Sequence, residues 1–414
     1  MTSDNPSTPK HPPPWLFMLT GMPYGIVGGF VATTLPYFTR KAGISVETIG
    51  WYGTALMLAP VLQFLYAPII DIGPKRKHWL VIVSVVGALC LWAALMMPLP
   101  DKVGAYVSFV FAGQLISGLV GSCNGGLLAS TLPNELRGQA AGYLNTGNLT
   151  GGALGAWLTL SMAEKYEFPP VVVGGALALL MIAPSLVALT FKEAERVKHT
   201  LNELFGHMIR DVWRVAKSRP GWTGILFCIS PVGSAALLNY FAALAPDYHA
   251  SPGMVAFING PINGLVSAGG ALAGGFLCDR INRRLMYLIS GGLTAVCGII
   301  MAFAPLTPNT YAVGVTFYLL ISGLCYAAFS AVVLEAIGKA GPAASTQYTL
   351  FTSAGNFAIM YVGWIDTRFH HNYGPRGLLG VDAGANVLGI LLLSVMIALI
   401  YRKKAVAPPA SAAA

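Results

Sequence analysis

Two short stretches of the sequence place a carboxylate, a tight turn and several cations between long apolar runs. They are DIGPKRK at residues 71–77 and DRINRR at residues 279–284, and Asp279 follows Asp71 by 208 residues in a chain of 414. A carboxylate in such a loop can pair with arginine and accept N–H bonds from the start of a neighbouring helix. We therefore predict two related latches that hold one half of the chain against the other. The alternative is a pair of solvated charges that only fix topology.

Two further carboxylates lie inside or at the edge of apolar runs, where burying a charge is costly and an acid is a candidate functional group. Glu335 follows three aliphatic residues near the end of one run, and Asp366 ends another. We predict that Glu335 carries a coupled proton and that Asp366 is the next candidate. The alternative for Glu335 is an ion pair with Lys339 at the membrane interface.

The composition is that of a membrane protein. Hydrophobic residues make up 55% of the chain and charged residues 10%, with a mean hydropathy of +0.65, whereas a soluble domain carries about 25% charged residues. The apolar runs are long enough to cross about 30 Å of hydrocarbon as helices. The net charge of +9 lies in the loops, so it does not indicate nucleic-acid binding.

The apolar runs predict twelve spans and five regions. Disordered tails are expected at 1–14 and 402–414, helical bundles at 15–191 and 221–401, and an amphipathic linker at the membrane surface over 192–220. The predicted spans are 15–37, 47–69, 79–97, 105–131, 141–163, 169–191, 221–246, 253–277, 285–304, 312–337, 344–366 and 378–401.

The distribution of cations predicts the orientation. Of the 25 Lys and Arg residues, 19 fall in one set of connections and 6 in the other. The set rich in cations faces the cytoplasm by the positive-inside rule. We therefore expect a multi-pass protein of the cytoplasmic (inner) membrane, with both termini and both latch loops in the cytoplasm.

The offset of 208 residues recurs in other spans. It relates Pro23 to Pro231, Gly25 to Gly233 and Gln139 to Gln347, and it relates residues 147–148 (Gly-Asn) to residues 355–356 (Gly-Asn). Six spans per repeat is an even number, so the two halves have the same orientation. This indicates a parallel repeat about an axis along the membrane normal.

The chain resembles the major facilitator superfamily in its twelve predicted spans and its two acid-turn-basic loops. The second loop, with the preceding GGFLC, fits the superfamily signature, whereas the first has Ala67-Pro68 in place of two small residues and Ile72 in place of a basic residue. The resemblance implies an all-α fold of twelve transmembrane helices in two parallel six-helix halves. It also implies that the loop residues act in gating, joined by Glu135 and Arg137 between the fourth and fifth spans, where a weak surface ion pair is the alternative. The implied gating residues are Asp71, Lys75, Arg76, Glu135, Arg137, Asp279, Arg280, Arg283 and Arg284.

Two stretches are similar to AmpG-type muropeptide permeases and their acetyl-CoA-transporter relatives. One runs from TIG at 48–50 to FLYAPIID at 64–71, and the other is STQYTLFTS at 345–353. This likeness implies uptake of a muropeptide-like cargo, although some carriers of this kind serve siderophores.

Amides and phenols inside the spans predict a wet cavity that suits a neutral or sugar-like cargo, since buried amides need partners. Hydrogen bonding between helices is the alternative for each residue taken alone. In the superfamily, helices 1, 4, 7 and 10 are central and helices 2, 5, 8 and 11 lie beside them. That arrangement implies cargo contacts from Tyr24, Gln114, Asn124, Asn239, Tyr240, Asn259, Asn263 and Asn356.

The sequence contains no pattern for a cofactor, a metal site or catalysis. The six cysteines and seven histidines show no metal-ligand spacing, and no phosphate-binding loop is present. We expect a monomer in the bilayer that moves a small-molecule cargo with a proton, and no nucleic-acid partner.

We therefore predict a secondary active transporter that takes up its cargo by alternating access, in which the central site opens to one side of the membrane and then to the other. An efflux pump and a non-transporting assembly factor on the same scaffold are the alternatives. A polar cavity favours transport, whereas a dry, apolar interface between the halves favours the scaffold.

Overall fold

The computed structural model describes residues 11–44, 46–193, 213, 217–337 and 344–405, and the regular elements in these ranges are all helical. Most of the predicted linker over 192–220 lies outside the described residues. The same holds for most of the two predicted tails.

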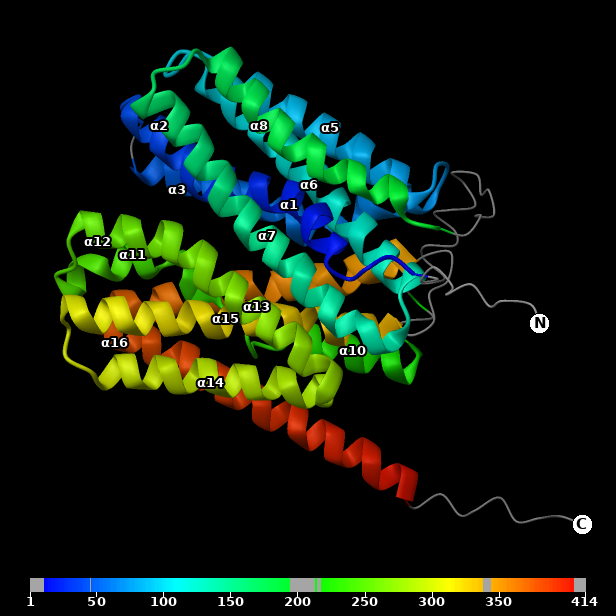
Figure 1. Ribbon diagram of the computed structural model, residues 1–414. Coiled ribbons are helices and arrows are strands. Elements are labelled where there is room, and N and C mark those ends of the chain that lie inside the picture. The colour runs from blue at the N-terminus through cyan, green and yellow to red at the C-terminus, as the bar shows by residue number, and fades with distance from the viewer. Residues whose placement is uncertain (1–10, 45, 194–212, 214–216, 338–343, 406–414) are drawn as a thin grey trace, which may run out of the picture.

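The helices form two groups that lie side by side (Figure 1). The first group contains α1 (Leu16–Gly29), α2 (Leu35–Lys41), α3 (Val46–Val61), α4 (Gln63–Tyr66), α5 (Arg76–Leu95), α6 (Val103–Thr131), α7 (Arg137–Leu160) and α8 (Pro170–Ser185). The second contains α10 (Arg219–Ile229), α11 (Phe241–Leu244), α12 (Pro252–Phe257), α13 (Asn263–Arg280), α14 (Arg283–Phe303), α15 (Pro308–Ile337) and α16 (Ala344–Ala405). In Figure 1 the groups come together at the right and diverge toward the left.

Eight helices in the described ranges are long and apolar enough to cross a membrane, or nine if the bent pair Trp51–Val61 and Gln63–Asp71 counts as one span. The twelve predicted spans exceed this number for physical reasons. Helix α7 is diluted by glycine, asparagine and threonine, and α10 ends after 11 residues. Helix α16 joins two predicted spans across Gly374, whose φ of 66° and ψ of −161° are not helical.

The span predicted over 221–246 is not one helix, and this corrects the sequence prediction. Helix α10 ends at Ile229, and only short helical turns follow it as far as Tyr248. Pro231 lacks the N–H that a helix needs, and Gly233 and Ala235 have φ values of 60° and 53° in the left-handed region. We call residues 230–235 the α10 break.

Glycines let helices of both groups approach to backbone contact. A Cβ on Gly25 of α1 would overlap the backbone of Asn148 on α7, and one on Gly147 would overlap that of Met18. Between the groups, a Cβ on Gly142 of α7 would lie 2.8 Å from the Cα of Gly275 on α13. Small residues of this kind allow tight helix packing in lipid, where no hydrophobic effect drives helices together.

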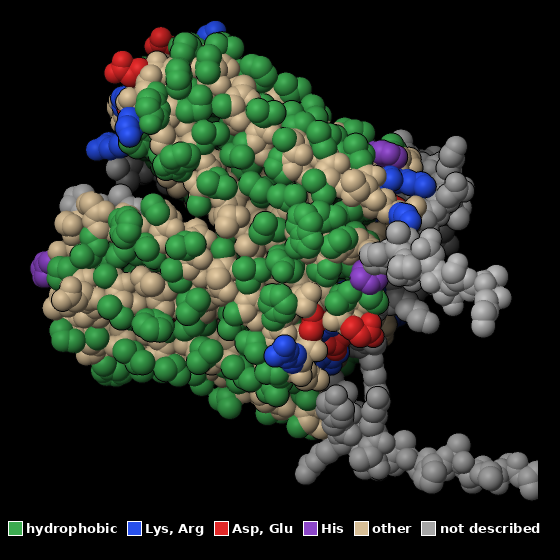
Figure 2. Space-filling model, viewed as in Figure 1, with side chains coloured by type: hydrophobic (Ala, Val, Ile, Leu, Met, Phe, Trp, Pro, Cys, Tyr) green, Lys and Arg blue, Asp and Glu red, His purple; other side chains and the backbone are tan. Residues whose placement is uncertain are grey.

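The outer surface suits a lipid environment. Hydrophobic side chains cover the middle of the face seen in Figure 2, and charged side chains gather at the two ends. We call the end that carries Arg76, Arg137 and Arg283 the basic end. The opposite end, where Lys41 pairs with Glu164 at 2.6 Å, we call the far end.

Candidate functional site

The carboxylate of Asp71 lies at the first turn of α16. It ends a 3-10 segment, Ala67–Asp71, and its Oδ2 accepts hydrogen bonds from the backbone N of Thr346 at 2.9 Å and the Thr346 hydroxyl at 2.8 Å. The first N–H groups of a helix have no partner within the helix, and a carboxylate there also suits the helix dipole. An acid of the first helical group thus caps a helix of the second.

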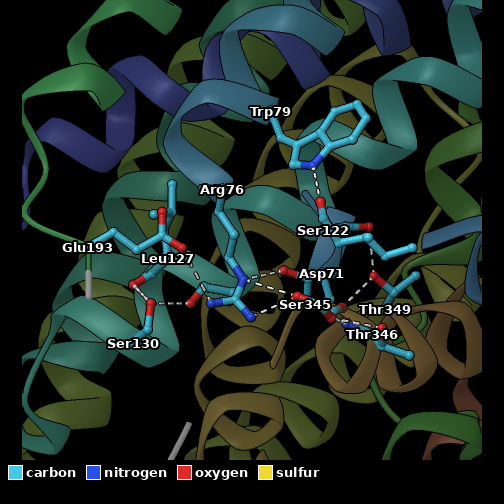
Figure 3. Close-up of polar contacts among 12 residues, drawn as sticks. Asp71, Arg76, Trp79, Ser122, Leu127, Ser130, Glu193, Ser345, Thr346 and Thr349 are labelled. Atoms are coloured by element: carbon cyan, nitrogen blue, oxygen red, sulfur yellow. Dashed lines mark hydrogen bonds and ion pairs between the residues drawn. The ribbon is translucent and has the colours of Figure 1, made fainter. Parts of the chain in front are cut away.

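Arg76 binds the other oxygen of Asp71. Its Nη2 donates to Asp71 Oδ1 at 2.7 Å, and its Nε donates to the Ser345 hydroxyl at 2.7 Å. On the other side its Nη1 lies 3.6 Å from Glu193 (Figure 3). The side chains of all three charged residues are at most 4% exposed. A buried cation of this kind depends on its carboxylates, because removing one partner leaves an uncompensated charge.

Asp279 makes the corresponding contact with α7. Its Oδ1 accepts from the backbone N of Gly138 at 2.9 Å, and its Oδ2 accepts from that of Gln139 at 2.7 Å. Arg283 lies 3.5 Å from Asp279 Oδ1 and donates to Asn134 Oδ1 at 2.9 Å. An acid of the second group therefore caps a helix of the first.

The two contacts are related by one offset. Asp279 follows Asp71 by 208 residues, and Thr346 follows Gly138 by the same number. Asp71 binds Thr346, and Asp279 binds Gly138, which is the equivalent of Thr346 in the other half of the chain. Both contacts lie at the basic end and join the two helical groups, and we call them the two aspartate latches.

The other predicted gating residues lie around the latches. Arg137 donates to the backbone carbonyls of Ala129 at 2.7 Å and Leu334 at 3.4 Å. Lys75 donates to the carbonyl of Glu193 at 3.4 Å. The pairing of Arg137 with an aspartate stays a prediction. Of the remaining three, Glu135 and Arg280 are exposed, and Arg284 pairs with Glu335.

Glu335 pairs with Arg284 at the basic end of α15, with 3.0 Å between Oε1 and Nε. The two side chains are 32% and 30% exposed. An ion pair with this much contact with solvent contributes little to stability. Glu335 is therefore a partly exposed, paired carboxylate and is not buried among apolar side chains. The partner considered from the sequence, Lys339, lies outside the described residues.

A cavity lies between the two helical groups. It contains about 980 Å³ of space between atoms, open solvent included. Of the described residues that line it, none is Asp, Glu, Lys, Arg or His. Amides and phenols supply most of its polar groups, namely Gln63, Asn124, Asn145, Asn148 and Asn356, with Tyr24, Tyr287, Tyr326 and Tyr348.

The structure brings three of the eight predicted cargo residues to this cavity. Tyr24, Asn124 and Asn356 line it. Asn259 instead donates to the Tyr311 hydroxyl at 2.9 Å, and Asn263 accepts from Ser267 at 3.0 Å. The other three predicted residues outside the lining are Gln114, Asn239 and Tyr240.

Sequence reasoning passed over several lining residues. Asn148 was the easiest to find, because Asn356 follows it by 208 residues and both line the cavity. Tyr326 and Tyr348 gave no such signal. A tyrosine in an apolar helix packs against its neighbours or faces a cavity depending on the rotation of that helix, which the sequence does not specify.

Four of the five cavity amides donate hydrogen bonds from their nitrogens to other groups of the protein. Each amide carries two donor hydrogens and one acceptor oxygen. No described residue donates a hydrogen bond to the side-chain oxygens of Gln63, Asn145 and Asn356, whereas Asn124 Oδ1 is buried without a partner among the described residues. The lining thus offers acceptors to a solute with hydroxyl or N–H donors. The donors' partners are the Ser122 hydroxyl for Gln63 (3.0 Å), the Thr20 carbonyl for Asn124 (2.8 Å), the Ser330 hydroxyl for Asn145 (3.0 Å) and the Pro60 carbonyl for Asn356 (3.2 Å).

Two carboxyl groups are buried in the second helical group. Asp366 and Asp382 lie on the two arms of α16, on either side of Gly374, and both are 0% exposed. Asp366 was the weaker predicted proton carrier. Asp382 was missed, although an acid four residues inside the predicted span 378–401 was a signal that the sequence offered.

The chain is similar in fold to solved transporters. The human organic anion transporter MFSD10 (TETRAN) matches with a TM-score of 0.69 at 14% identity, over 91% of this chain and 98% of that one. The proton:xylose symporter XylE bound to 6-bromo-6-deoxy-D-glucose matches with a TM-score of 0.69 at 13% identity, over 93% and 94%. The transporter FucP in its outward conformation matches with a TM-score of 0.69 at 14% identity, over 92% and 97%. No curated protein sequence matches the chain.

The family model described as Major Facilitator Superfamily matches residues 17–363, which is most of the chain. The chain therefore belongs to the Major Facilitator Superfamily and is a multi-pass membrane transporter, not an enzyme.

Proposed function

We propose that the protein is a secondary active transporter that takes up a small, uncharged, hydroxyl-rich solute by alternating access, with a proton as the coupled ion. The observation that carries this proposal is the cavity between the two helical groups, lined by amide and phenol groups without a charged side chain. Sugar-like solutes suit such a lining, and muropeptide-like or siderophore-like cargo follows from the AmpG-type resemblance. A polar cavity also favours transport over the assembly-factor alternative.

The proposed cycle needs twelve spans in two six-helix halves. The bent pair α3–α4, the glycine-rich α7, the broken region from α10 to α11 and the two arms of α16 would supply the spans beyond those that are apolar and continuous. The two aspartate latches would then hold the state that is shut at the basic end, and rocking of the halves would expose the cavity there.

A ligand screen tests the cargo class. Neutral solutes rich in hydroxyl groups should raise the melting temperature of the purified protein, because a ligand that binds only the folded state stabilises it. Coenzyme A esters should not, because the cavity lining offers no cation for their phosphates. Stabilisation by polyanions alone would contradict the proposal.

Asn148→Ala should weaken binding of the best solute from that screen about tenfold. The loss of one hydrogen bond costs about 1–1.5 kcal/mol, and tenfold corresponds to about 1.4 kcal/mol. Titration calorimetry measures the change. Asn309→Ala, at an exposed residue of α15, is the control, and equal affinity in both variants would remove Asn148 from the solute site.

The orientation is tested by cysteine labelling. We place the basic end in the cytoplasm, since most cations lie in the connections at that end. In intact cells an impermeant maleimide should react with Glu167→Cys at the far end and reach His78→Cys only after permeabilisation. Both positions are exposed. The unsubstituted protein is the control for the six native cysteines, and labelling of His78→Cys in intact cells would reverse the orientation.

A further inference from the structure

The two arms of α16 bring Asp366 and Asp382 together inside the second helical group. Each aspartate lies eight positions from Gly374, where the chain turns back between the arms (Figure 1). The two carboxyl groups interact electrostatically with each other. Neither is used by the latches or by the lining of the cavity.

Most oxygens of this carboxyl pair have no hydrogen-bond partner. Both oxygens of Asp366 and the Oδ1 of Asp382 are buried without a partner among the described residues. Asp382 Oδ2 lies 3.5 Å from both the Tyr318 hydroxyl and the Asn386 amide. Buried polar atoms nearly always have a partner, and buried acids in membrane proteins mark ion pathways. The unpartnered oxygens therefore indicate a ligand that the protein binds here.

No cation of the described residues compensates the pair. The titratable groups that face it are the phenols of Tyr240 and Tyr318, with the thiol of Cys297 on α14 next to Tyr318. His370, on the same arm as Asp366, pairs instead with Asp247 at 3.5 Å. Two ionised carboxylates in such a place would repel each other and lose their hydration, whereas one shared proton removes the repulsion and leaves only one charge without hydration.

The pair is connected to the cavity by one residue. Asn386 lies one helical turn after Asp382, and its Oδ1 accepts a hydrogen bond from the backbone N of Gly233 at 2.7 Å. Gly233 lies in the α10 break and lines the cavity. Its left-handed φ and its contact with Cys325 leave no room for a side chain. A change at Asp382 therefore reaches the wall of the cavity through one amide side chain.

We propose that Asp366 and Asp382 form the proton site of this transporter and that Asn386 transmits its occupancy to the α10 break. The proposal rests on the proposed function for its physiological role. A proton from water forms an O–H bond on one carboxylate of the pair in one state of the cycle. In the other state that bond breaks and the proton returns to water on the opposite side.

The first experiment is an infrared pH titration of the full-length purified protein without any solute, so that the proton is the only probe. As the pH is lowered to about 5, where exposed acids with pKa values near about 4 are still largely ionised, a carboxylic-acid C=O band should appear in the wild type and be lost in Asp366→Asn and in Asp382→Asn. Asn has nearly the shape of Asp, and gel filtration checks folding. Asp101→Asn, at an exposed acid, should keep the band. A band that persists in both pair variants, or that sodium chloride removes at constant pH, would overturn the proposal.

The second experiment tests Asn386 as a positioning residue. Ser234→Cys places a thiol in the α10 break and in the cavity lining. Any cysteine reacts faster with a maleimide as the pH rises, because more of it is thiolate, and the exposed His78→Cys measures this ordinary effect. The reaction rate of Ser234→Cys should show an additional dependence on pH. Asn386→Ala should keep the infrared band and remove this extra pH dependence. Retention of the extra dependence in Asn386→Ala would exclude the connection. Neither readout needs transport, so a failed ligand screen would count against the proposed function and leave the proton site standing.

Discussion

Gly25→Ala should prevent stable folding, although it adds a single methyl group. Its Cβ would overlap the backbone carbonyl of Asn148, and backbone cannot rotate away as a side chain can. Helix α7 would have to move off α1, which would open the packing along the whole of their contact. Overpacking typically costs 1–3 kcal/mol, and we expect a loss of at least about 3 kcal/mol here because the clash is with main chain.

Gly28→Ala is the matched control for this effect. Gly28 lies on the same helix, is exposed, and a Cβ there would meet nothing within 4 Å. Alanine is favoured over glycine inside a helix by about 1 kcal/mol, so this variant should be at least as stable as the wild type. Thermal unfolding in detergent, followed by fluorescence and gel filtration, compares the two. Equal melting temperatures would show that α1 and α7 are not in backbone contact.

The double variant Asp71→Asn with Asp279→Asn should open the basic end. Asparagine keeps the shape of each side chain but removes the charge that compensates Arg76 and that caps the first turns of α16 and α7. Breaking a buried ion pair costs about 3–5 kcal/mol, and this cost falls on the latched state alone. A shift of only about 1.4 kcal/mol already changes the population ratio tenfold.

Labelling of Thr352→Cys, in the cavity lining, measures this opening. In inside-out vesicles the rate with an impermeant maleimide should rise at least about tenfold in the double variant. Each single variant should show part of the rise. The exposed Asp101→Asn should leave the rate unchanged. An unchanged rate in the double variant would mean that the aspartates do not hold the groups together.

The sequence was sufficient to locate the latch aspartates but not their partners. The loops at 71–77 and 279–284 stand out because charge is rare between long apolar runs. The sequence does not mark the capped positions, Gly138 and Thr346. Asp71 and Asp279 bind backbone N–H groups there, and every residue except proline has such a group. Only the arrangement of the two groups in space identifies them.

The cavity was harder to predict because its wall depends on helix breaks and rotations. Asn239 and Tyr240 were assigned to cargo on the assumption of a continuous helix over 221–246. Pro231 and the left-handed Gly233 end α10 first, and the chain beyond them runs in short turns. The backbone of Gly233 itself, rather than an amide side chain further along, reaches the cavity.

The exchanged contacts of Asp71 and Asp279 are the contact pattern of an isologous homodimer. In such a dimer, residue i of one subunit contacts residue j of the other, and the reverse contact also forms. Subtracting 208 from 279 and 346 gives 71 and 138, so both latches become one pair, Asp71 with residue 138. A half-length chain with one such pair would join a copy of itself through two identical contacts. The two halves of the present chain are not identical, since the supporting arginine lies five residues after Asp71 but four after Asp279.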